Sequence, residues 1–194
     1  MAIEYTNRFG VTYYLRCGRT ARDRPRYYFS RQTNESAVDN IPAGYMVRES
    51  INGVVSLAKE RPELFRVEEI RAIESAVGRH PMHRNYRVAV SGDYIQVYQR
   101  VDLEAEEAIN DIVRMGFASR SKGAALIASR EQRARYTPVL RFGLADQSAR
   151  RFCVQRTSYR GDGGWLPIGG LGPLPILAKL IIPTLGADAF FELF

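Results

Sequence analysis

The amino-acid sequence predicts an α+β fold, in which an antiparallel sheet built from about four β-hairpins is covered by three to five helices. Short segments of β-like residues come in four pairs, each joined by turn residues. Segments with a helical period separate these pairs, and adjacent hairpins favour antiparallel pairing. The 194 residues are 45% hydrophobic and 25% charged, which is typical of one soluble globular domain.

Alternating polarity and turn residues define the four predicted hairpins. In the third pair, Tyr86 and Val88 flank Arg87, so one face of the strand is apolar and the other is polar. The turn of the second pair contains Asn52-Gly53, which supplies the positive φ that tight hairpin turns require. The paired segments are 11–17 with 25–31, 45–49 with 54–59, 86–90 with 94–98, and 139–144 with 152–157.

Apolar residues at helical spacing predict the helices that cover the sheet. Ile70, Ile73 and Val77 lie on one stripe of a helix over residues 67–77. Asp102 is placed to cap a second helix, which ends near Gly116. The other predicted helices are 124–133, one that begins at 173–175 and stops at 183, and a short one from 188. We expect a single domain over residues 1–194, with an internal division near 117–135.

Positive charge is concentrated in two segments of the chain. The net charge of +7 and the isoelectric point of about 9.6 favour anionic partners, either nucleic acid or an acidic protein surface. Residues 1–35 contain seven arginines against three acidic residues, and residues 110–142 contain seven basic residues against two acidic ones. If folding brings both segments to one surface, that surface would bind a polyanion with a strong dependence on salt.

The first hairpin combines aromatic rings, which can stack on bases, with guanidinium groups, which can hold phosphates. Alternation places Tyr27 and Phe29 on one face of the second strand, and Arg26 and Tyr28 on the other. The alternative interpretation is a solvated arginine-rich loop, and no RRM, KH, zinc-finger or helix-turn-helix signature decides between the two. The candidate nucleic-acid contacts are Arg19, Arg22, Arg24, Arg26 and Tyr28 in this hairpin, and Arg120, Lys122, Arg130, Arg133 and Arg135 in the second basic segment.

A glycine-rich segment, residues 159–165, is a candidate for a ligand pocket. Arg160, Asp162 and Trp165 could line a small polar and aromatic site, because the intervening glycines let backbone approach a ligand closely. The alternative is a turn that Trp165 anchors to the core. The chain contains no G-x-S-x-G, no H-E-x-x-H and no C-x-x-C. We therefore expect a binding protein rather than an enzyme, and an enzyme with an unrecognised site near residues 159–165 is the remaining alternative.

The histidines and cysteines indicate neither a metal nor a cofactor. His80 and His83 have no close acidic or cysteine neighbours, whereas zinc needs three or four ligands. Cys17 and Cys153 lie far apart and suit a reducing compartment. The sequence shows no signal peptide and no uninterrupted apolar run long enough for a spanning helix. These features predict a cytoplasmic protein without a membrane partner.

An apolar tail at residues 190–194 supports a second hypothesis. Three of its five residues are phenylalanine. Exposed apolar patches of this kind mark surfaces that bind other proteins. The chain could therefore be an assembly subunit that forms homo-oligomers through this tail.

Seven short motifs follow one another along the chain. They are Tyr13-Tyr14-Leu15, Arg26-Tyr27-Tyr28-Phe29-Ser30, Pro42-Ala43-Gly44-Tyr45, Asn52-Gly53, Tyr136-Thr137-Pro138, Tyr159-Arg160-Gly161 and Phe190-Phe191-Glu192-Leu193. This succession resembles a set of bacterial proteins described only as uncharacterised, and the resemblance spans most of the chain. It implies no activity and no site, but it favours a bacterial cytosolic protein.

Overall fold

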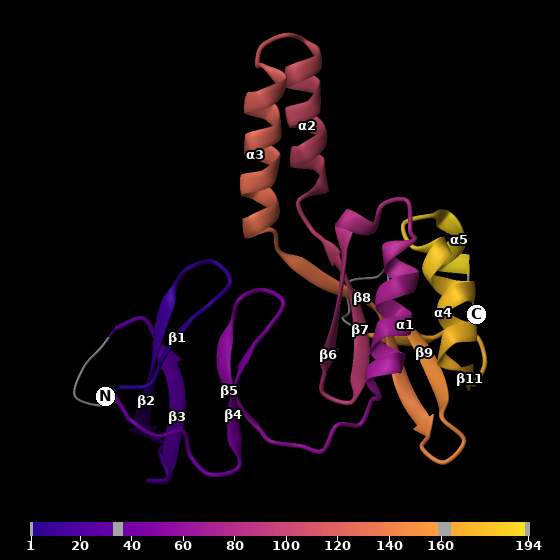
Figure 1. The fold of residues 1–194 in the computed structure, drawn as a ribbon. Coiled ribbons are helices and arrows are strands. Elements are labelled where there is room, and N and C mark those ends of the chain that lie inside the picture. The colour runs from indigo at the N-terminus through magenta and orange to yellow at the C-terminus, as the bar shows by residue number, and fades with distance from the viewer. Residues whose placement is uncertain (1, 33–36, 159–163, 193–194) are drawn as a thin grey trace. The chain divides into compact units, whose positions relative to one another are not determined.

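The computed structural model describes residues 2–32, 37–158 and 164–192, except for the side chains of 103–107. It confirms the α+β class, because antiparallel sheets are combined with α-helices (Figure 1). The chain divides into two compact units: unit 1 contains Met1–Pro62 and Ala124–Arg133, and unit 2 contains Glu63–Gly123 and Ala134–Phe194. None of the helices within the described ranges is long and apolar enough to cross a membrane.

Unit 1 contains two small antiparallel sheets, which correspond to the first two predicted hairpins. The three-stranded sheet has the order β1-β2-β3, and the two-stranded sheet pairs β4 with β5. Strand β1 was not predicted, because three residues are too few to establish an alternation. The bounds of the strands are β1 Glu4–Thr6, β2 Thr12–Arg19, β3 Pro25–Ser30, β4 Tyr45–Glu49 and β5 Val55–Lys59.

A buried asparagine connects the two sheets of unit 1. The Asn7 side-chain nitrogen donates to the Gly53 carbonyl oxygen at 2.7 Å. Its side-chain oxygen accepts hydrogen bonds from the backbone N–H groups of Phe9 and Val11, each at 3.0 Å. Gly53 has φ +72°, and a Cβ atom there would lie 2.4 Å from the Phe9 ring. Both the turn and the packing therefore require glycine at this position.

Unit 2 is built on an antiparallel sheet with the strand order β10-β9-β8-β7-β6, in which β11 also pairs with β9. The pairs β6–β7 and β8–β9 confirm the third and fourth predicted hairpins. Strands β10 and β11 were not predicted, because proline and glycine are rare inside strands. The bounds are β6 Tyr86–Ser91, β7 Tyr94–Arg100, β8 Tyr136–Asp146, β9 Arg151–Thr157, β10 Trp165–Pro167 and β11 Gly172–Pro173.

Helices α1 (Val67–Gly78) and α4 (Leu174–Ile181) cover one face of this sheet (Figure 1). Ile73 of α1 belongs to the same core cluster as Leu140 and Phe142 of β8, and all three side chains are inaccessible to solvent. Burial of each such side chain stabilises the fold by roughly 1.5–3 kcal/mol. In the described part of unit 2, no helix covers the opposite face (Figure 1). The short helices are α5 Asp188–Glu192 and the 3-10 turns His83–Asn85 and Ile182–Thr184.

An ion pair joins the first turn of α1 to the turn between β8 and β9. The Arg150 guanidinium donates through Nε to Oε1 of Glu69 at 2.8 Å and through Nη2 to Oε2, and both side chains are largely buried. The Glu69 carboxylate also accepts the backbone N–H of Arg66 at 2.8 Å, which satisfies a donor at the start of the helix. Burial raises the pKa of Glu69, but the bonds from Arg150 and Arg66 outweigh it and hold the pKa below its ordinary value.

Helices α2 (Leu103–Arg114) and α3 (Arg120–Arg133) follow β7. Helix α3 begins four residues earlier than the predicted residue 124. Ser119 explains the difference, because its hydroxyl accepts the Lys122 N–H at 3.3 Å, as an N-cap residue does. A Cβ atom at Gly123 would lie 2.5 Å from a methyl group of Val113, so glycine permits the start of α3 to approach α2 closely.

Candidate functional site

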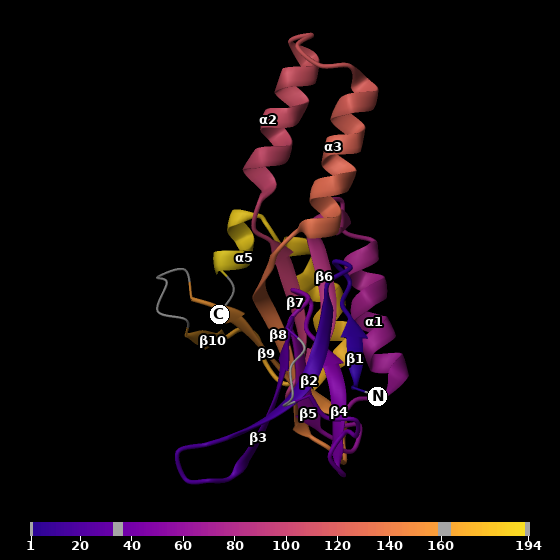
Figure 2. The same cartoon turned by 90° about the vertical axis from the view of Figure 1, so that its left-hand side faces the viewer.

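The β2–β3 hairpin is buried near one end and exposed at the other. Leu15 is completely buried and pairs with Phe29. At the other end, residues 25–28 are all exposed. The outer half of the hairpin, residues 16–28, therefore forms a two-stranded projection. We call this projection the arm. Figure 2 shows the loop of this hairpin extending beyond the other strands of unit 1.

One face of the arm combines arginines with an aromatic ring. The register pairs Arg16 with Tyr28 and Gly18 with Arg26, which confirms the predicted alternation of β3. The Arg16 guanidinium lies 5.5 Å from the centroid of the Tyr28 ring. A Cβ atom at Gly18 would lie 3.3 Å from this ring, so the ring passes over the glycine. This face therefore presents an aromatic surface framed by two positive charges.

The other face of the arm carries a second exposed aromatic ring. Tyr27 pairs with Cys17, on the side opposite to Tyr28. Both tyrosines are 38% exposed. Large aromatic side chains usually bury most of their surface, whereas these two adjacent rings are exposed on opposite faces of the arm.

The loop of the arm is closed by backbone hydrogen bonds, and its side chains face solvent. The N–H of Thr20 donates to the Arg24 carbonyl oxygen, and the N–H of Asp23 donates to the Thr20 carbonyl oxygen, both at 2.9 Å. The Arg19 guanidinium lies 2.7 Å from the Asp23 carboxylate, and both side chains are about three-quarters exposed. Residues 16–26 contain five arginines and one aspartate, so their net charge is 5 − 1 = +4. The exposed arginines are Arg19, Arg22, Arg24 and Arg26.

The second basic segment lies on α3 and its flanks. Arg130 and Arg133 lie in the last turn, where positive charge stabilises the helix dipole. Arg120 and Lys122 lie at the opposite end, where the dipole disfavours positive charge, so helix stability does not explain them. All five predicted contacts of this segment are exposed: Arg120, Lys122, Arg130, Arg133 and Arg135. The arm belongs to unit 1 and Arg120 to unit 2, and the convergence of the two basic segments stays a prediction.

Of the three residues in the predicted ligand pocket, Arg160 and Asp162 lie outside the described residues. Trp165 opens β10, where it pairs with Thr157, and it is half-buried rather than part of the core cluster. Its ring centroid lies 4.1 Å from the guanidinium carbon of Arg141. Sequence reasoning did not select Arg141 as a functional residue. The alternation of its strand, with Leu140 and Phe142 on the apolar face, was the signal that places it on the opposite face.

His80 is buried and serves a structural role. Its Nδ1 accepts the Met82 N–H at 3.1 Å, and its Nε2 lies 3.1 Å from the Leu185 carbonyl oxygen, to which it donates. Both ring nitrogens are thus engaged in the neutral tautomer. Within the described ranges, no group of three or more histidine, cysteine, aspartate or glutamate side chains could hold a metal ion.

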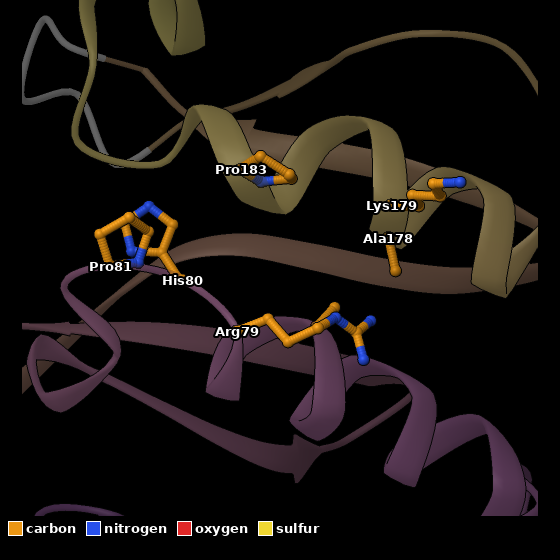
Figure 3. A pocket seen from close by; sticks show the side chains of 7 residues that line it. Arg79, His80, Pro81, Ala178, Lys179 and Pro183 are labelled. Atoms are coloured by element: carbon orange, nitrogen blue, oxygen red, sulfur yellow. The ribbon is translucent and has the colours of Figure 1, made fainter.

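A cavity of about 100 Å³ lies beside His80, between the end of α1 and α4 (Figure 3). Arg79 and Lys179 approach it from the two helices, and the Arg79 guanidinium donates to the Ser75 hydroxyl at 2.7 Å. Ligand pockets for drug-sized molecules are about 300–1,000 Å³, so this cavity is too small for a cofactor. The residues that line it are Ala76, Arg79, His80, Pro81, Ala178, Lys179 and Pro183.

Among the described residues, the most exposed large apolar side chain lies in the turn between α2 and α3 and not in the C-terminal tail. Phe190 is 3% exposed and packs in the core of its own unit, and residues 193 and 194 lie outside the described residues. In the turn between α2 and α3, Met115 is 70% exposed and Phe117 is 81% exposed. Phe117 is thus the most exposed large apolar residue in the part of the chain that the structure describes.

Comparison with known proteins finds no family model, no curated protein and no solved structure that matches this chain.

Proposed function

We propose that this protein binds nucleic acid through the arm, residues 16–28. The observation that carries the proposal is that residues 19–28 of this two-stranded ribbon are all exposed, and that residues 16–28 contain five arginines against one aspartate. Tyr27 and Tyr28 add one exposed ring to each face. Folding alone gives no reason for this combination, because the hairpin is anchored at its other end by Leu15 and Phe29.

A two-stranded ribbon has dimensions that suit a nucleic-acid groove. The major groove of B-DNA is about 12 Å wide and admits a β-ribbon. Arginines along the ribbon would contact phosphates and fix its position, and these contacts carry no sequence information. The exposed rings offer stacking surfaces to unpaired bases. Affinity is therefore expected to come mainly from charge, with stacking as a smaller addition.

Charge-driven binding predicts a steep dependence on salt, which anisotropy titrations of a labelled DNA duplex can measure. With about four phosphates contacted, affinity should fall roughly a hundredfold between about 50 and 200 mM salt. The triple variant Arg22→Gln, Arg24→Gln, Arg26→Gln should lower the slope of log affinity against log salt by about 2–3. Duplex RNA and single-stranded DNA, titrated in parallel, identify the preferred form.

A matched control removes the same charge elsewhere. Lys59, Arg71 and Arg84 are exposed and lie outside the arm, so replacing all three with glutamine should leave the slope nearly unchanged. The proposal fails if the wild-type protein does not bind, if binding is insensitive to salt, or if the control variant loses as much affinity as the arm variant. In those cases the arm is simply a solvated hairpin.

A second candidate function is self-assembly, and the exposure of Met115 and Phe117 favours it. Light scattering should then give a mass above that of one chain, and Phe117→Ser should restore the monomer. Phe191, which is 40% exposed in α5, provides the comparison for the tail hypothesis. If Phe191→Ser lowers the mass and Phe117→Ser does not, the tail is the interface. If the wild-type protein has the mass of one chain, neither the α2–α3 turn nor the tail mediates self-assembly.

A further inference from the structure

The face of the unit 2 sheet opposite α1 and α4 carries a row of polar side chains. Gln96 of β7 pairs with Arg141 of β8, which pairs with Gln155 of β9. Residues that pair across neighbouring strands project to the same side, so all three lie on one face. Tyr94 of β7 and Trp165 of β10 flank this row. The face thus has a polar centre with an aromatic ring on each side.

Arg141 is held between the two rings. Its guanidinium carbon lies 4.0 Å from the Tyr94 ring centroid and 4.1 Å from the Trp165 ring centroid. Its Nε donates to Oε1 of Gln155 at 2.6 Å, which fixes the rotation of the guanidinium plane. Two cation–π contacts and a hydrogen bond therefore fix the position of a single half-buried charge.

Gly143 makes this arrangement sterically accessible. A Cβ atom at this position would lie 2.8 Å from the Tyr94 ring and 3.2 Å from the Cys153 sulfur. Its φ is not in the left-handed region, so the requirement is space rather than backbone conformation. The missing side chain lets the Tyr94 ring lie across β8 and reach Arg141.

The terminal nitrogens of Arg141 form no hydrogen bond with the part of the chain that the structure describes. Within the described residues, its only hydrogen bond is the one from Nε, so four N–H groups on Nη1 and Nη2 have no acceptor there. Other arginines of unit 2 with little exposure differ. Arg100 pairs with Asp102, Arg150 pairs with Glu69, and Arg156 donates to the carbonyl oxygen of Phe191.

We propose that Arg141, clamped between Tyr94 and Trp165, is the binding site for an oxyanion, either the phosphate or the carboxylate of a small molecule. The planar guanidinium matches the spacing of two oxygens in either group. Because Gln155 occupies Nε, the anion binds end-on to Nη1 and Nη2. The side chains of the polar row are otherwise uncharged, so the anion supplies the missing counter-charge. The site does not depend on the proposed function of the arm.

Trp165 makes the site directly observable, because it is the only tryptophan in the chain. Sodium phosphate and sodium malonate are titrated separately at constant ionic strength, with sodium chloride as the reference. We expect a saturable change in tryptophan emission with at least one of the two anions, and none with chloride. The anion with the tighter saturation identifies the ligand class.

Substitutions test whether Arg141 itself binds the anion. Arg141→Gln should abolish the saturable change, and Arg141→Lys should weaken binding about ten- to a hundredfold, because lysine keeps the charge but loses the planar fork. Gly143→Ala keeps Arg141 but displaces Tyr94, so it should weaken binding by a smaller factor. Arg87→Gln is the matched control, since Arg87 is exposed on β6 and lies outside the clamp.

Circular dichroism of each variant separates a lost site from a lost fold. If Arg141→Gln does not fold, the side-chain ¹H–¹⁵N signals of Arg141 in the wild-type protein decide the matter, because they should shift on addition of the anion. The proposal is overturned if neither anion gives a saturable change, if those signals stay fixed, or if a folded Arg141→Gln protein responds like the wild type.

Discussion

The arm and the Arg141 clamp are made from the same kinds of residue but differ in how firmly those residues are held. On the arm, Arg16 lies 5.5 Å from the single ring of Tyr28. In the clamp, Arg141 lies about 4 Å from each of two rings and is also bonded to Gln155. The arm carries several exposed charges, which suit the polyanion that we propose as its partner, whereas the clamp holds one oriented charge, which suits the small anion that we propose as its ligand.

The comparison shows that register and burial decide what an arginine–aromatic pair does, and composition alone does not. An exposed pair contributes little to stability, because water and salt screen it and the long side chain loses entropy. A half-buried guanidinium between rings is desolvated, so its interactions are stronger and its orientation is defined. Specific recognition is therefore expected from the clamp and salt-dependent affinity from the arm.

The largest expected effect concerns a third type of arginine, which is fully engaged by a carboxylate. Arg150 forms a largely buried ion pair with Glu69, and removing one partner leaves a buried charge uncompensated. Arg150→Gln should lower the free energy of unfolding by about 3 kcal/mol. Chemical denaturation measures this loss of stability. Arg22→Gln on the arm is the control, and it should change the free energy of unfolding by less than about 0.5 kcal/mol. Equal losses of stability in both variants would contradict the expectation that Arg150 stabilises the fold more than Arg22 does.

The same pair predicts a pH dependence of stability. The pKa of Glu69 is lower in the folded protein than its ordinary value of 4.5. Because this pKa is lower in the folded protein, the stabilisation by Glu69 is complete at a pH above the pKa of the unfolded protein. It is lost as the pH falls through the pKa of the folded protein. Wild-type stability should therefore fall more steeply below about pH 4.5 than that of Glu69→Gln. If stability falls equally steeply with pH in the two proteins over the acid range, Glu69 does not contribute to the pH dependence of stability.

A smaller effect on DNA binding distinguishes the Tyr28 ring of the arm from the Tyr94 ring of the clamp. Tyr28→Ala should weaken binding of single-stranded DNA to the arm by about tenfold, since each stacked base contributes roughly 1–3 kcal/mol. Duplex binding should change little, because paired bases are not free to stack. Tyr94→Ala removes a ring whose face is already occupied by Arg141, and it serves as the control. Loss of DNA binding in Tyr94→Ala would mean that the clamp face, and not the arm, contacts the strand.

The four hairpins and most helices could be predicted from the sequence, because each has its own periodicity or turn residues. Asn52-Gly53 is an example, since the turn it predicts is confirmed by a φ of +72° at Gly53. Strand β10 was missed because Pro167 and its neighbouring glycines resemble a loop, and only pairing with β9 makes it a strand.

The clamp could not be predicted for a different reason. Tyr94, Arg141 and Trp165 come from three strands that are distant in sequence, and their meeting depends on the β7–β8–β9–β10 order. The space above Gly143, which admits the Tyr94 ring, is also a property of the register and not of any local pattern. Sequence alternation identified which residues of β3 share a face, but it carried no information on which strands are neighbours.

The smallest expected effect tests whether charge alone governs the arm. Asp23 is the only acidic residue of the loop and pairs with Arg19 in an exposed contact. Asp23→Asn keeps a side chain that tolerates the positive φ of 56° at this position, and it raises the net charge of residues 16–26 from +4 to +5. Stability should stay within about 1 kcal/mol, because exposed ion pairs contribute little. DNA affinity at low salt should rise a few-fold, and this gain should shrink as salt is added. A gain in affinity that persists at high salt would instead indicate a direct contact between the asparagine amide and DNA. The arm would then take part in specific recognition, which we expect only from the clamp.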